Sequence, residues 1–93
     1  MRSVKELLQV MLDNQKLYNV GLCNWANKLY FNNLITHEER MSLRKYIDKN
    51  RPNKWSSLNA FLHRNSLFYW NTDNIKPRIK WIKKHIKELN FNQ

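Results

Sequence analysis

The scarcity of glycine and proline is the feature that most constrains this chain, since its 93 residues contain one Gly and two Pro. A β sandwich or barrel uses such residues at its many tight turns, so both architectures are disfavoured. Hydrophobic residues make up 42% of the chain and aromatic residues 13%, which argues against disorder. We expect an all-α fold of four to five short helices, with at most one short strand-like segment, in a single helical domain over residues 1–93.

Helix start signals and apolar periodicity divide the first half of the chain. Ser3 and Thr36 are each followed three residues later by a glutamate, Glu6 and Glu39, and this spacing is the capping box that opens a helix. The first box predicts an amphipathic helix of about three turns. The second predicts a helix that ends at Asn-Arg-Pro, residues 50–52. Between these helices, a polar connection at 14–20 precedes a second predicted helix from residue 21 to about 33.

The remaining chain is less regular until its last segment. Residues 53–74 are compatible with a short helix near 55–62 and an extended stretch at 67–70. A final helix is expected from about Ile75 or Pro77 to Leu89, because proline is tolerated in the first turn of a helix.

An apolar stripe runs along this final helix and consists of Ile75, Ile79, Ile82, Ile86 and Leu89. Its spacing alternates between four and three residues, as in a heptad seam. The stripe is expected to dock the helix on the core or, as an alternative, to join copies of the chain in a homo-oligomer with a structural or assembly role. Two heptads are fewer than a coiled coil usually needs.

Positive charge is concentrated near the end of the chain. The whole chain has 17 basic and 7 acidic residues, net +10, and a surplus of this size attracts polyanions. Abundant Lys and Asn are also typical of AT-rich coding sequences, so coding bias is an alternative source of the charge. Residues 74–93, however, hold six basic residues and one acidic residue, or half of the excess. A uniform bias does not produce that concentration.

The lysines of the final helix share one side of it, about 120° from the apolar stripe. They are Lys76, Lys80, Lys83, Lys84 and Lys87. They either present a row of charges to phosphates or form the solvated face that any core helix needs. Trp81 lies off the stripe beside Arg78 and His85. It is either covered by other parts of the chain or exposed as a platform that stacks a base.

These features predict a non-enzymatic protein that captures a phosphate-bearing ligand, either a nucleotide or a nucleic acid. Phosphate would be neutralised by Arg51, Arg78 and Lys80, assisted by Lys83, Lys84 and Lys87, and the base would stack on Trp81 and on Tyr69 or Trp70. The alternative is a protein-directed inhibitor that binds an acidic protein surface or the nucleic-acid groove of a protein. Aromatic and arginine side chains dominate the energetics of such interfaces.

Sequence signals for catalysis, metals, cofactors and membranes are weak. His37-Glu38-Glu39 has no second histidine four residues on, and a single Gly excludes glycine-rich phosphate loops. The single Cys23 excludes a disulfide framework and a multi-cysteine zinc site. We expect no enzyme activity, no metal and no cofactor. The longest apolar run, at 67–70, is too short for a membrane span or a signal-peptide core, so we expect a cytoplasmic protein.

Four short motifs resemble short accessory proteins encoded by bacteriophages. They are Gly-Leu-Cys-Asn-Trp at 21–25, Asn-Arg-Pro at 50–52, Tyr-Trp at 69–70 and Pro-Arg-Ile-Lys-Trp-Ile-Lys-Lys-His-Ile at 77–86. The resemblance covers most of the chain from the second predicted helix onward. It implies a class of protein that counters host defence or redirects host machinery by stoichiometric binding in the host cytoplasm. The captured partner would be a nucleotide immune signal, a nucleic acid or a host defence protein.

Overall fold

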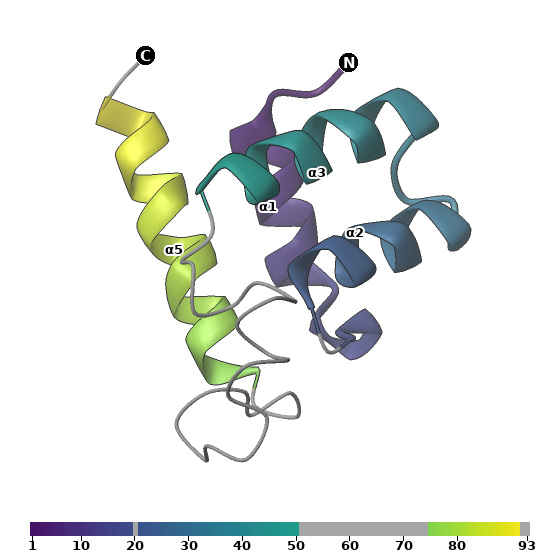
Figure 1. Cartoon of the computed structure of the whole chain (residues 1–93), viewed down its shortest axis with the longest axis horizontal. Coiled ribbons are helices and arrows are strands. Elements are labelled where there is room, and N and C mark those ends of the chain that lie inside the picture. Colours follow the sequence, from purple (N-terminus) through teal and green to yellow (C-terminus); the bar gives the residue numbers. More distant parts are fainter. Residues whose placement is uncertain (20, 51–74, 92–93) are drawn as a thin grey trace.

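The computed structural model describes residues 1–19, 21–50 and 75–91, which form four α-helices and one short 3-10 turn (Figure 1). The helices are α1 (Val4–Asp13), α2 (Leu22–Phe31), α3 (His37–Asn50) and α5 (Lys76–Phe91), and the turn η1 is Gln15–Leu17. The described residues contain no strand, so the predicted all-α class is confirmed for them. The short helix and the extended stretch expected within 53–74 lie outside the described residues.

Helix α1 lies between a helical hairpin and α5 (Figure 1). The hairpin is formed by α2 and α3, which residues 32–36 connect, and α5 packs against α1 on the other side. All four helices contribute to one core. Its largest fully buried side chains are Leu7, Leu8, Met11, Trp25, Leu29, Leu43, Ile47 and Ile82.

Both predicted capping boxes are present. At the start of α1, the Ser3 hydroxyl accepts a hydrogen bond from the Glu6 amide at 3.2 Å, and the Ser3 amide donates to the Glu6 carboxylate at 3.0 Å. At the start of α3, Thr36 and Glu39 make the same reciprocal pair at 3.1 and 2.9 Å. Amide groups that a helix start leaves without a partner are thereby satisfied locally.

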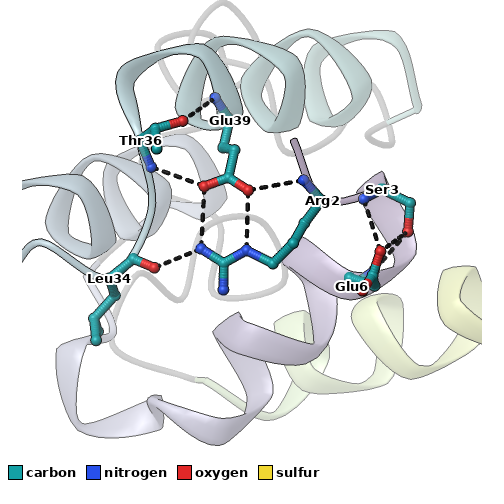
Figure 2. Close-up of polar contacts among 6 residues, drawn as sticks. All are labelled: Arg2, Ser3, Glu6, Leu34, Thr36 and Glu39. Atoms are coloured by element: carbon teal, nitrogen blue, oxygen red, sulfur yellow. Dashed lines mark hydrogen bonds and ion pairs between the residues drawn. The ribbon is translucent and has the colours of Figure 1, made fainter.

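Glu39 also binds Arg2, 37 residues away in sequence (Figure 2). Arg2 Nε donates to Glu39 Oε2 at 2.9 Å and Arg2 Nη2 donates to Oε1 at 3.1 Å, a two-point contact. Arg2 Nη2 also donates to the Leu34 carbonyl oxygen at 2.7 Å. Glu39 is only 4% exposed, and the hydrogen bonds from Arg2 and Thr36 hold the pKa of its carboxyl well below the usual range. This clasp ties the start of the chain to the α2–α3 connection.

Asn33, two residues after the end of α2, adopts the left-handed backbone region, with φ of 61°. The Leu34 amide donates to the Leu29 carbonyl at 3.0 Å, and the Asn33 amide donates to the Tyr30 carbonyl at 2.9 Å. These two bonds are the Schellman pattern that closes the last turn of a helix. Glycine usually occupies this position, and asparagine is the common substitute. The motif turns the chain sharply toward α3.

The connection between α1 and α2 packs on a buried indole. Trp25 has no exposed surface, and its Nε1 donates to the Asn14 carbonyl oxygen at 3.3 Å. The ring of Tyr18 meets the Trp25 ring edge-on, with 5.4 Å between centroids. Within the polar segment predicted at 14–20, residues 14–19 are therefore held against the core by Tyr18 and the Asn14 carbonyl.

Candidate functional site

The side of α5 that faces the core overlaps the predicted apolar stripe and extends beyond it. Arg78, Trp81, Ile82 and His85 are buried, whereas Ile79 is half-buried and lies outside the core cluster of the described residues. At about 100° per residue, the centre of this buried side is rotated by about 70° from the stripe. Four of the five stripe residues do pack on the core, since Ile82 is buried and Ile75, Ile86 and Leu89 are partly buried against it. Arg78, Trp81 and His85 extend the buried side beyond the stripe.

Helix α3 explains the rotation, since it provides partners for these side chains. Tyr46 Oη lies 2.8 Å from His85 Nδ1, and Trp81 Nε1 donates to the Asn50 carbonyl oxygen at 3.4 Å. The Trp81 and His85 rings pack on each other with 4.1 Å between centroids. Burial lowers the pKa of His85 and raises the pKa of Tyr46. The sequence did not identify this pair, because 39 residues separate Tyr46 from His85.

Arg78 and Trp81 are 3% and 6% exposed, so neither side chain forms part of the open surface of α5. Burial also lowers the pKa of the Arg78 guanidinium. For Trp81, the structure shows the covered alternative, with Tyr46 and His85 against its ring. The binding roles expected for Arg78 and Trp81 remain predictions. Arg51, Tyr69 and Trp70, the other residues expected to bind phosphate or base, lie outside the described residues.

The lysines of α5 are all exposed. We call Lys76, Lys80, Lys83, Lys84 and Lys87 the lysine face. Their positions fall within an arc of about 100°, whose centre is about 165° from the centre of the buried side. At 1.5 Å per residue, the face extends about 17 Å along the helix axis. The structure therefore brings together four of the predicted ligand-binding residues, Lys80, Lys83, Lys84 and Lys87, on one surface.

Little negative charge opposes the lysine face on its own helix. Glu88 is the only acidic residue of α5. Its Oε1 lies 3.9 Å from Lys84 Nζ, and both side chains are largely exposed, so this contact is weak in water. Its Oε2 lies 3.6 Å from His85 Nδ1. The face is therefore strongly positive along its whole length.

Other kinds of site find little support in the described part of the chain. Within residues 1–19, 21–50 and 75–91, no group of three or more His, Cys, Asp or Glu side chains is arranged to hold a metal ion. None of the described helices has the length and apolar character that crossing a membrane requires. An open pocket of about 540 Å³ is lined by Met1, Arg2, Glu6, Thr36, Glu38 and Glu39.

Comparison of the chain with protein-family models, with curated proteins and with solved structures gives no match. The lysine face is the candidate site, since it combines exposure, length and a single sign of charge.

Proposed function

We propose that this protein is a non-enzymatic binding protein that holds a nucleic acid along the lysine face of α5. The observation that supports the proposal is the placement of five lysines opposite the buried side of one helix, over about 17 Å. Lysine ammonium groups bind phosphates as point charges, and the release of counterions from the nucleic acid supplies much of the affinity.

The length of the lysine face favours a polymer over a single nucleotide. Duplex DNA carries one phosphate per about 3.4 Å of axis on each strand, so about 17 Å of axis offers about five phosphates per strand. The phosphates of one nucleotide are adjacent to each other and would engage only part of the face. The pocket beside Arg2 suits a nucleotide poorly, because Glu6, Glu38 and Glu39 line it and repel phosphate.

The resemblance to short bacteriophage accessory proteins supplies the biological setting of the proposal. In that setting the protein would act stoichiometrically in the host cytoplasm and mask a nucleic acid from host defence. No catalytic step is needed for this role. Affinity would come from charge and would depend little on base sequence, since phosphate contacts carry no direct sequence information.

The test is a titration of a short fluorescein-labelled DNA duplex at several salt concentrations, with a single strand and a cyclic dinucleotide as competitors. If three to five phosphates are neutralised, the slope of log K against log salt should be about −3 to −4.5. The triple variant K80E/K83E/K87E should lose most of its affinity for the duplex, and its log K should depend much less on salt. A nucleotide that competes better than the duplex would overturn the choice of a polymer.

The matched control is the triple variant K16E/K28E/K45E, which makes the same change in net charge at exposed lysines outside α5. We expect this control to bind the duplex several-fold more tightly than K80E/K83E/K87E. Equal losses in the two variants would show that net charge alone drives binding, and the lysine face would then have no special role.

A further inference from the structure

A second exposed surface lies at the end of the α2–α3 hairpin, on the other side of α1 from α5 (Figure 1). The described residues include five exposed large hydrophobic side chains, and three of them, Phe31, Leu34 and Met41, belong to this end. Phe31 is 70% exposed at the last position of α2. The other two, Met1 and Phe91, lie near the ends of the chain. We call Tyr30, Phe31, Leu34, His37, Arg40 and Met41 the corner surface.

Arg40 is held in place within the corner surface. Its guanidinium carbon lies 4.2 Å from the centroid of the Tyr30 ring and 5.9 Å from that of Phe31. Its Nη2 lies 2.9 Å from His37 Nδ1, and the His37 ring meets Tyr30 with 5.8 Å between centroids. A guanidinium fixed in this way loses less conformational freedom when it binds a carboxylate at two points.

The rigid backbone beneath the corner surface supports the same role. The Schellman bonds at Asn33 set the exit from α2, and the Arg2–Glu39 clasp anchors the connection through the Leu34 carbonyl oxygen. Exposed apolar side chains on a pre-organised backbone, next to a fixed arginine, have the composition of an interface hot spot.

Charge indicates which partner fits. Lys28 lies one helical turn before Phe31, and Arg44 lies one helical turn after Met41. Together with Arg40 they bring three positive charges to the corner surface, against the single negative charge of Glu38. A second copy of this chain, with net charge +10, would be repelled. Phe31 offers an exposed ring, but the aliphatic Leu34 and Met41 beside it favour apolar side chains over a stacked base. A protein segment that combines carboxylates with apolar side chains complements both properties.

We propose that the corner surface docks an acidic amphipathic segment of a partner protein. Apolar side chains of that segment would cover Phe31, Leu34 and Met41, and a carboxylate would bind Arg40. This inference is independent of the lysine face, because the two surfaces lie on opposite sides of α1.

The test uses two synthetic peptides and the isotope-labelled full-length chain. The first peptide places Glu on one face of a helix and Leu and Phe on the other, and the second replaces Leu and Phe by Ser. In NMR titrations we expect the first peptide to shift the amides of residues 28–45, and the second to shift only those of α5. Phe31→Ser and Arg40→Gln should each lower the affinity for the first peptide by about tenfold.

Phe91→Ser is the matched control, since Phe91 is 79% exposed at the other side of the molecule, and it should leave the affinity unchanged. The inference fails if both peptides shift only the amide signals of α5. It also fails if F31S and F91S change the affinity for the first peptide by the same factor. It also fails if the corner amides shift with protein concentration, which would indicate a second copy, or with the DNA duplex. A duplex that shifts the corner amides would also question the lysine face as the nucleic-acid site. The other failures leave the nucleic-acid proposal untouched, because they are read from residues 28–45 and from variants outside the lysine face.

Discussion

The hydroxyl oxygen of Tyr46 lies 2.8 Å from Nδ1 of His85 and joins α3 to the buried side of α5. In the neutral tautomer that carries its proton on Nε2, Nδ1 accepts the hydrogen bond from Tyr46. Protonation of the ring removes that acceptor. The helix that carries the lysine face is therefore held by a contact that is lost when His85 takes up a proton in acid, and burial lowers the pKa at which it does so.

We expect stability to fall in mildly acidic solution because of His85. Burial lowers its folded-state pKa below the ordinary 6.5, so the unfolded state takes up this proton first. The free energy of unfolding should then be unaffected by His85 above pH 6.5 and decrease as the pH falls from there to the folded-state pKa. Urea denaturation between about pH 5 and 8 measures this decrease.

His85→Gln should abolish this part of the pH dependence, since an amide can bond to Tyr46 but does not titrate. Tyr46→Phe serves as the comparison. It should cost about 1 kcal/mol through the lost hydrogen bond and retain the pH dependence. An unchanged decrease between about pH 7 and 5 in H85Q would show that another group is responsible.

A second acid-sensitive contribution is expected from Glu39. Because its folded-state pKa is depressed, its stabilisation is fully present above the ordinary value of 4.5 and is lost as the pH falls below it. Glu39→Gln should lower the free energy of unfolding by about 1–3 kcal/mol at neutral pH, through weaker hydrogen bonds to Arg2 and Thr36. The variant should also show a smaller decrease in the free energy of unfolding as the pH falls below 4.5. The exposed neighbour offers a control, and an equal effect of Glu38→Gln would contradict the assignment.

Replacing Asn33 by glycine should leave the stability nearly unchanged, whereas a β-branched residue at this position should lower it. The left-handed backbone at this position is free of strain for glycine, so Asn33→Gly should change stability by less than about 0.5 kcal/mol. Asn33→Val should lose about 1–2 kcal/mol, because a β-branched side chain crowds the backbone in the left-handed region, which the short polar side chain of Asn tolerates. Thermal denaturation of both variants tests this order. Equal stability of the two would mean that the left-handed turn is not maintained in solution.

Trp81 should prove important for stability and unimportant for binding along the lysine face. Trp81→Phe keeps an aromatic ring beside His85 but removes the Nε1 donor to Asn50, at a cost of about 1–2 kcal/mol in unfolding free energy. The Kd for the DNA duplex should stay within about twofold of the parent value, since the ring is buried. A large loss of duplex affinity at unchanged stability would support the base-stacking role instead.

Much of the local structure could be predicted because the interactions that create it lie within a few residues. Ser3 with Glu6 and Thr36 with Glu39 are three residues apart, and each pair forms the expected capping box. The exposure of the lysines was predictable for the same reason, since charge at helical spacing marks a solvated side. Whether that side binds phosphate is a separate question, which the titrations address.

The sequence by itself determined the all-α class, the helix starts and the side of α5 that carries lysine, because these depend on spacing of three or four residues. Only the tertiary structure decided which residues of α5 face inward and what Glu39 binds besides its own helix. Tyr46 and Asn50 contact α5 across 39 and 31 residues of sequence, and Arg2 reaches Glu39 across 37. A buried Trp81 or Glu39 is favourable only when its polar atoms find partners, and those partners come from another part of the chain.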